Sequence, residues 1–459
     1  MNIEIASRKK AEGYIKLSTL IIIAFASAFF ARLFDTIGFP SYINFLHFAT
    51  VPLTFGIVLF TTKTKNSYQI AATWTLLSGL LILIGVLLVS ALLNQAGLIN
   101  VIMDFLLLAE SFLLLIALIS LNMYPKTLER MQVWIIRFCF INLILAYLQH
   151  YIIIPLIYSS LKTTLLTVDL VQGVFYISGA GNSLSASVSM FFGLYYFQSG
   201  NKAPLWLRIT VMIAAFWQVI ISDSKQVLVV FILAWGILAL TKVKDIKKLL
   251  LSVIGIVLIL ATLLWCAENL QAFRPFKTYL DPEWYDLNSR TMQIKLASVQ
   301  IIPSYYKSPL NWFFGLGPGH TVGRLGGWML KDYDYLLIPF GATVHPASQA
   351  VWDRFSSLAF GGVIGSISTF FSPFWGWAGI WGDIGFVGLG AYLYLGYLVW
   401  SKLCTDDFCK LLLLNIVIFG FIFTQLEEPA YMLSIAMFIG LRWHENRLES
   451  YNLNDNFSN

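Results

Sequence analysis

The sequence predicts an all-α polytopic membrane protein, and three observations support this fold class. Of its 459 residues, 58% are hydrophobic and only 12% are charged, whereas about a quarter of the residues of a soluble protein are charged. Apolar runs of about 20 residues, the length that crosses a bilayer as a helix, recur along the chain. Lysine and arginine gather in alternate connections between these runs. We therefore expect residues 1–459 to form a single integral membrane domain.

The positions of the apolar runs predict about twelve transmembrane helices. The first run follows Arg8-Lys9-Lys10 and is interpreted as an uncleaved helix, because further spans come after it. The expected spans cover residues 14–34, 41–60, 68–93, 98–121, 131–157, 181–197, 205–221, 226–240, 249–266, 378–400, 411–425 and 429–441.

The distribution of lysine and arginine predicts the orientation of the chain. Short connections and helix ends on one side of the expected membrane hold only Arg32, Lys162 and Lys225, while the other side collects most of the remaining cations. Cations in short loops mark the cytoplasmic side, so both termini are expected in the cytoplasm. Residues 267–375, between spans nine and ten, then form one large extracytoplasmic loop. The net charge of +6 reflects this bias, and no nucleic-acid partner is expected.

The cysteines predict neither a disulfide nor a metal site. Cys139, Cys266, Cys404 and Cys409 have no recognisable metal-ligand spacing. We expect no metal and no cofactor.

The loop 267–375 is expected to contain surface helices and anion-binding residues. Apolar positions after Asn288-Ser289-Arg290 have the spacing of a helix that lies on the membrane surface, with Asn or Ser as its cap. Arg290 in the first turn opposes the helix dipole, which favours an anion-binding role over a solvated surface arginine. The loop carries eight cations in all: Arg274, Lys277, Arg290, Lys295, Lys307, Arg324, Lys331 and Arg354.

A glycine-rich turn follows in the same loop. Gly315, Gly317 and Gly319 permit unusual backbone angles, so the turn either lets a ligand approach main-chain N–H groups or is a plain turn. His320 comes directly after it, and Arg324 lies one turn later. Tryptophans in the loop and at its exit either mark a membrane interface or stack on sugar rings: Trp284, Trp312, Trp328, Trp352, Trp375, Trp377 and Trp381.

Several residues could act as a catalytic base. His320 is the first choice, because a neutral histidine accepts a proton near physiological pH, and His345 is the second, with a structural role as the alternative for each. Glu427 and Glu428, between the last two spans, could supply a carboxylate base or pair with an arginine of the loop.

Charged residues also occur at the edges of the spans and inside them. Lys225 begins an apolar run at the outer face, where it could pair with Asp223, extend to the interface, or bind a lipid-linked phosphate. Asp104 and Glu110 lie within the fourth span. They are interpreted as buried partners of polar residues, and a proton path is the alternative.

The order of these features resembles that of the O-antigen polymerase and O-antigen ligase superfamily of bacterial envelope glycan assembly. The similarity extends from roughly Gly179 to Tyr397. Each short motif is similar to one that the family carries at a corresponding place: Gly181-Asn182-Ser183, Ser222-Asp223-Ser224-Lys225, Asn288-Ser289-Arg290, Phe314 to Gly319, and Trp381 to Leu389.

The resemblance implies a GT-C-like, membrane-embedded glycosyltransferase of the bacterial inner membrane. Its donor would be a polyprenyl-diphosphate-linked oligosaccharide, and no metal is implied. Carried over by position, Lys225 and Arg290 would bind the diphosphate, with a lysine where the family has an arginine. Membrane lipids and a chain-length regulator are the further partners that such a protein would have.

One departure favours a polymerase over a ligase. Ligases of this family have a His-Asn-like pair shortly before the post-loop motif, where this sequence reads Phe371-Ser372-Pro373-Phe374-Trp375. We therefore expect a polymerase of lipid-linked repeat units. A ligase and a solute or anion transporter, with Asp104 and Glu110 as coupling residues, are the alternatives.

Overall fold

The computed structural model consists of helices and their connections, with no strand among the described residues. It describes residues 15–63, 66–158, 167–176, 180–199, 203–242, 246–270, 273, 276–277, 281–359 and 369–457. The basic run Arg8-Lys9-Lys10, Lys162, Gly179 and Arg274 lie outside these residues. An all-α fold is therefore confirmed for the described part of the chain.

The longer helices form the bundle and follow the apolar runs. They are α1 (Leu17–Phe29), α3 (His47–Thr61), α4 (Ser67–Asn94), α5 (Leu98–Ser120), α6 (Pro125–Leu148), α8 (Gly181–Gln198), α9 (Leu205–Ile221), α10 (Lys225–Leu240), α11 (Ile246–Asn269), α17 (Gly376–Lys402), α18 (Asp407–Phe419) and α19 (Pro429–Phe457).

Short helices connect the long ones and build the loop. Outside the loop these are α2 (Ala31–Thr36), η1 (Ser41–Phe45), η2 (Gln149–Ile153), α7 (Ile154–Tyr158), η3 (Thr167–Leu170) and η10 (Gln425–Glu427). Between α11 and α17 they are η5 (Pro282–Tyr285), α12 (Arg290–Ile301), η6 (Ile302–Tyr305), α13 (Leu310–Phe314), η7 (Leu325–Met329), α14 (Leu330–Asp332), α15 (Asp334–Leu337), η8 (Ile338–Phe340), α16 (Pro346–Ala359) and η9 (Thr369–Phe371).

Six helices in the described residues are long and apolar enough to cross a membrane, and three shorter ones are also apolar. This finding supports a membrane-embedded protein. The other expected spans correspond to α8, α18 and α19, which do not meet the same standard of length and hydropathy. The number twelve remains a prediction.

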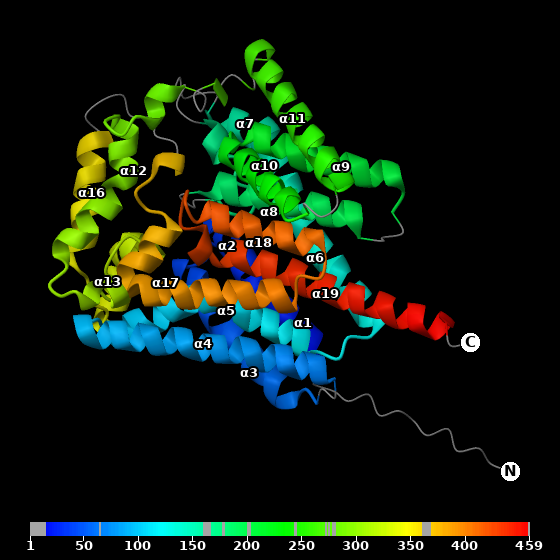
Figure 1. Ribbon diagram of the computed structural model, residues 1–459, viewed down its shortest axis with the longest axis horizontal. Coiled ribbons are helices and arrows are strands. Elements are labelled where there is room, and N and C mark those ends of the chain that lie inside the picture. The colour runs from blue at the N-terminus through cyan, green and yellow to red at the C-terminus, as the bar shows by residue number, and fades with distance from the viewer. Residues whose placement is uncertain are drawn as a thin grey trace.

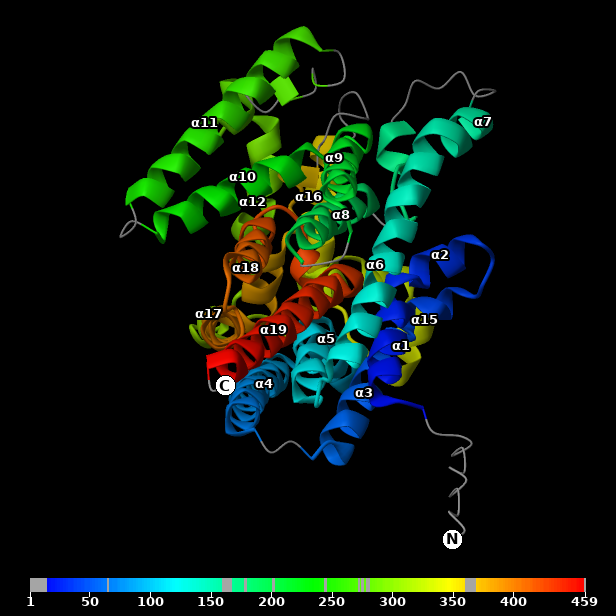
Figure 2. The same cartoon turned by 90° about the vertical axis from the view of Figure 1, so that its right-hand side faces the viewer.

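The helices pack around α5, which is buried on nearly all of its faces. Helices α3, α4 and α19 lie against it, and α17 packs on α4. Helix α11 lies at the margin beside α10 and exposes most of its apolar side chains (Figure 2). The loop helices α12, α13 and α16 gather at one end of the bundle, and α19 ends at the other (Figure 1).

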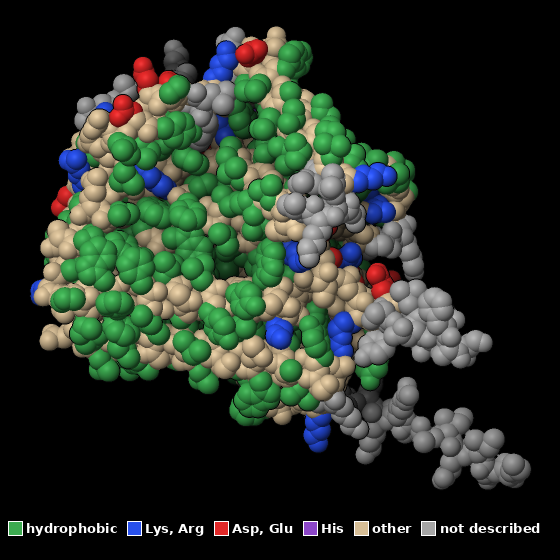
Figure 3. All heavy atoms as spheres, viewed as in Figure 1, with side chains coloured by type: hydrophobic (Ala, Val, Ile, Leu, Met, Phe, Trp, Pro, Cys, Tyr) green, Lys and Arg blue, Asp and Glu red, His purple; other side chains and the backbone are tan. Residues whose placement is uncertain are grey.

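The surface agrees with this arrangement. Hydrophobic side chains cover the middle of the face in Figure 3, while charged side chains lie towards the loop and towards the opposite end.

Two expected spans are interrupted. Phe30 separates α1 from α2, and Gly385, with a φ of 67°, breaks α17. The break at Gly385 lies beside the loop, where the carbonyls of Gly382 and Asp383 accept hydrogen bonds from Leu316 and Gly317.

Candidate functional site

A cleft of about 780 Å³ opens beside the loop and combines three kinds of side chain. Its walls come from α2, η7, α14, α16, η9 and the turn after α18. Three cations line it: Arg32, Arg324 and Lys331. Carboxylates stand at Asp35, Asp332 and Asp353, and the aromatic walls are Trp328, Tyr333, Trp352, Phe355, Phe374 and Phe423. By contrast, a cavity of about 340 Å³ between α5, α17, α18 and α19 has no charged side chain among the described residues that line it.

Arg324 lies at the floor of the cleft and is held twice by the turn before α19. Its backbone N–H donates to a carboxylate oxygen of Glu427, and its guanidinium forms an ion pair with Glu428. The Arg324 and Glu428 side chains are only 13% and 9% exposed. Burial lowers the pKa of Arg324, as does the charge of Arg32, while Glu427 opposes this effect. The guanidinium nevertheless stays protonated, so the cleft has a partly desolvated positive charge at its floor.

Glu427 is buried behind the backbone of Arg324. It is 2% exposed, and its Oε1 has no hydrogen-bond partner. Two glycines make room for it, because a β-carbon on Gly323 or Gly379 would approach its carboxylate to 3.0 or 3.2 Å. Burial raises the pKa of Glu427 to about 8, helped by the charge of Asp383 and opposed by Arg324. Glu427 is thus mostly protonated at neutral pH.

The glycine turn docks onto the break in α17. Gly315, Gly317 and Gly319 all have positive φ, as their sequence predicted. The N–H groups of Leu316 and Gly317 donate to the carbonyls of Gly382 and Asp383 at 2.8 and 3.0 Å. The Asp383 carboxylate then accepts from Gly319 N and from both the N–H and the hydroxyl of Thr321.

These contacts change the interpretation of the turn as an anion cradle. Its main-chain donors bind acceptors of the chain itself, so they fix the loop against α17. The same docking places Arg324, three residues after Thr321, at the cleft floor.

The two histidines lie side by side outside the lining of the cleft. Their ring centres are 5.4 Å apart. His320 is 3% exposed; its Nδ1 donates to the Leu316 carbonyl, and its Nε2 accepts from Thr343 Oγ1, each at 2.8 Å. Burial lowers the pKa of His320, and burial together with the nearby His320 and Lys307 lowers that of His345 to about 4. Both rings are neutral at pH 7, and His320 has both nitrogens occupied.

Lys225 and Arg290 occupy different surroundings. Lys225 is 9% exposed, and its Nζ lies 2.6 Å from Asp223 Oδ1. Arg290 is exposed at the start of α12, where Ser289 caps the helix as expected by accepting from Met292 N. No contact joins Lys225 to Arg290 in the part of the chain that the structure describes.

The η9 turn lies between these two residues and reaches the cleft. Gln226, next to Lys225, donates to Thr369 Oγ1 at 3.1 Å, and Thr369 lines the cleft. Phe371 packs on Trp284, with ring centres 5.4 Å apart. The start of α10 therefore borders one end of the cleft through η9.

Sequence reasoning did not assign roles to Asp383, Lys331 or Arg32. Asp383 belongs to the motif that begins at Trp381, and Lys331 and Arg32 are among the cations expected on the outer side. The sequence therefore contained an indication for each of these residues. Lys331 and Arg32 reach the cleft from separate elements of the fold. Lys331 Nζ lies 4.7 Å from the centre of the Trp352 ring, and Arg32 comes from α2.

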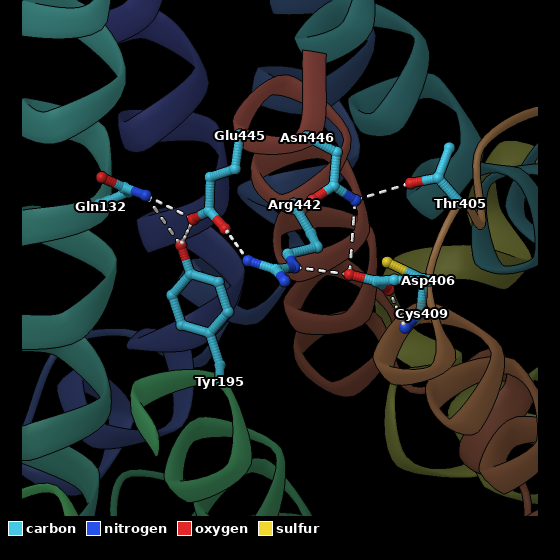
Figure 4. A network of polar contacts seen from close by, with 8 residues as sticks. All are labelled: Gln132, Tyr195, Thr405, Asp406, Cys409, Arg442, Glu445 and Asn446. Carbon is cyan, nitrogen blue, oxygen red and sulfur yellow. Dashed lines mark hydrogen bonds and ion pairs between the residues drawn. The ribbon is translucent and has the colours of Figure 1, made fainter. Parts of the chain in front are cut away.

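A second polar network lies at the opposite end of the bundle (Figure 4). Arg442 Nε donates to Asp406 Oδ2 at 2.5 Å, and its Nη1 donates to Glu445 Oε2 at 2.7 Å. The other Glu445 oxygen accepts from Gln132 and Tyr195, and the other Asp406 oxygen caps α18. The network joins α6, α8, α18 and α19.

Two comparisons with known proteins found no match. No family model matches the chain, and no curated protein matches it significantly. Within the described residues, no group of three or more histidine, cysteine, aspartate or glutamate side chains has an arrangement that could hold a metal ion.

Proposed function

We propose that the protein is a polysaccharide polymerase. It would be a GT-C-like glycosyltransferase with twelve spans and cytoplasmic termini in the bacterial inner membrane. There it joins polyprenyl-diphosphate-linked oligosaccharide repeat units at the outer face. The observation that carries the proposal is the cleft, because cations, carboxylates and aromatic rings meet in it beside the loop.

The cations of the cleft suit a diphosphate leaving group. When the bond between the sugar and the diphosphate breaks, negative charge develops on the departing phosphate oxygen, and cations placed there stabilise it. Arg324 and Lys331 line the cleft. An arginine can bind phosphate oxygens in a bidentate manner, and a lysine binds them as a point charge. Lys225 does not line the cleft, but the adjacent Gln226 contacts Thr369 of η9, so Lys225 is assigned a supporting role.

The aromatic walls suit the sugars of a repeat unit. Trp328 and Trp352 pack around Phe374, with ring centres 5.4 and 4.4 Å from it. The Trp352 indole is oriented by a hydrogen bond from its Nε1 to the Gly327 carbonyl at 2.6 Å. Rigid aromatic faces next to charged groups can contact the apolar face of a sugar ring while its hydroxyls meet polar groups.

The deciding experiment is a deletion strain whose surface glycan is separated by length. A polymerase mutant should display single repeat units in place of a long ladder. Loss of even the single units, with accumulation of lipid-linked glycan, would indicate a ligase. An unchanged ladder would refute both activities.

A buried contact between a histidine and a glutamate favours a transporter as the second candidate function. His47 Nδ1 lies 2.8 Å from Glu110 Oε2, and the two residues are 5% and 1% exposed inside the bundle. Ionisable residues inside a membrane domain often belong to proton or ion pathways. If this pair couples transport, His47→Gln should abolish solute uptake by proteoliposomes and leave the glycan ladder intact. A shortened ladder with normal uptake would exclude this candidate.

A further inference from the structure

We propose that Glu428 is the general base of this site and that Arg324 masks it until the donor diphosphate binds; this inference rests on the proposed polymerase function. Arg324 lines the cleft, its guanidinium contacts the Glu428 carboxylate, and both side chains are largely withdrawn from solvent. Arg324 faces the cavity, and Glu428 stands behind its guanidinium.

Hydrogen bonds hold the backbones of both Arg324 and Glu428, so a change of partner would involve only their side chains. Glu428 N donates to the Gln425 carbonyl at 3.1 Å, and the Glu428 carbonyl accepts from Met432 N at 3.0 Å. The backbone of Arg324 is tied to Glu427. A change of partner at the guanidinium would therefore leave the surrounding chain in place.

The charges around Arg324 make such a change favourable when an anion arrives. Glu427 is bound to the backbone N–H of Arg324, and Asp383 already accepts three hydrogen bonds from the turn. Glu428 is thus the carboxylate whose described side-chain partner is the guanidinium itself. Phosphate oxygens compete for the same donors in a charge-assisted, bidentate manner. A carboxylate that loses its cation becomes a better proton acceptor.

The resulting reaction is balanced in atoms and charge. The acceptor hydroxyl gives its proton to the Glu428 carboxylate, and the acceptor oxygen forms the new bond to the anomeric carbon. The bond from that carbon to the diphosphate oxygen breaks, and its electron pair leaves with the diphosphate, where Arg324 and Lys331 stabilise the charge. Glu428 then releases the proton to solvent as Arg324 returns.

The other base candidates fit this role less well. His320 has both ring nitrogens occupied. Glu427 binds the main-chain N–H of Arg324 and not its guanidinium, so a diphosphate that takes the guanidinium would not release Glu427. It is better described as a positioning residue, because it holds the main chain of Arg324.

The test compares Glu428→Gln with wild type in two assays on the full-length protein. Binding is measured with undecaprenyl diphosphate, and turnover with lipid-linked repeat units extracted from the deletion strain. We expect Glu428→Gln to bind undecaprenyl diphosphate at least as tightly as wild type, because the competing carboxylate charge is gone. Turnover should fall by about 10²–10⁴-fold, the usual contribution of a general base.

Two further variants separate catalysis from folding. Glu428→Asp keeps a carboxylate and should recover part of the turnover, whereas Glu283→Gln, an exposed change on η5, should match wild type. Turnover by Glu428→Gln within about threefold of wild type would overturn the base assignment. So would a parallel loss of binding and melting temperature, which would indicate a structural role. Failure of wild type itself to elongate the lipid-linked units would instead refute the polymerase, and the base assignment with it.

Discussion

Two arginines at opposite ends of the bundle are surrounded by carboxylates in different ways. Arg442 bridges Asp406 and Glu445, and every oxygen of those two carboxylates has a described partner (Figure 4). Arg324 has one described side-chain partner, Glu428, and the neighbouring Glu427 leaves one buried oxygen unpaired. The first network is closed on itself, whereas the second faces a cavity.

This difference distinguishes charged groups that stabilise the fold from charged groups that face the cleft. A fully satisfied buried network fixes one arrangement of the helices. A buried carboxylate oxygen without a partner is costly, so the carboxylates around Arg324 are less completely satisfied than those around Arg442. We therefore predict different effects for matched substitutions in the two networks.

Among the substitutions that compare the two arginines and their surroundings, the largest expected effect comes from Arg324→Lys. Lysine keeps the charge but loses the bidentate fork, so polymerisation should fall by roughly 10²-fold, the cost of losing one oriented donor to developing charge. The melting temperature should stay near that of wild type, because Glu427 binds the backbone at this position. Glycan ladders and melting curves of the purified protein measure the two quantities.

The matched change at the other end, Arg442→Lys, should have the opposite outcome. A lysine cannot contact Asp406 and Glu445 as Nε and Nη1 do, so one charge-assisted hydrogen bond is lost, about 1.5–3 kcal/mol of stability. Activity per folded molecule should be unchanged. If Arg442→Lys lowered activity while Arg324→Lys lowered stability, the contrast between the two networks would fail.

Lys331→Met should weaken the binding of undecaprenyl diphosphate by about tenfold. This is close to the loss in affinity expected when one hydrogen bond to a charged group is removed. Lys331 lines the cleft with its Nζ against the Trp352 ring, and burial lowers its pKa. Lys307→Met, an exposed change elsewhere in the loop, is the control. Equal affinity for the two variants would remove Lys331 from the site.

The smallest expected effect is a change in pH dependence. Burial raises the pKa of Glu427 from its ordinary range to about 8, so the folded protein favours the protonated carboxyl. Stability from this group is retained at low pH and declines as pH rises towards and through 8. Glu427→Gln cannot ionise, so its melting temperature should fall less between pH 6 and pH 9. Parallel curves for the two proteins would show that Glu427 does not titrate there.

Local features of the fold were predictable from the sequence, and the assembly of the site was not. Apolar runs predicted the helices, Ser289 caps α12, and the glycines of the turn have positive φ because these properties depend on neighbouring residues. The break at Gly385 and the binding of the turn by Asp383 depend on residues more than sixty positions apart. The cleft needs α2, α16 and η9 together, so its cations appeared in the sequence only as unexplained outward charges.

The docking of the glycine turn on α17 also constrains the order in which the protein can mature. Ser90 of α4 donates to the carbonyls of both Phe314 and Asp383, so it joins the turn to a helix made later in synthesis. A β-carbon on Gly315 would lie 2.4 Å from the Asp383 backbone, so the turn and α17 pack directly against each other. The loop is synthesised before α17, so the turn can dock only after α17 has been made. The cleft can therefore form only after α17 and the turn that contains Phe423 have been made, so products truncated before α17 should lack activity.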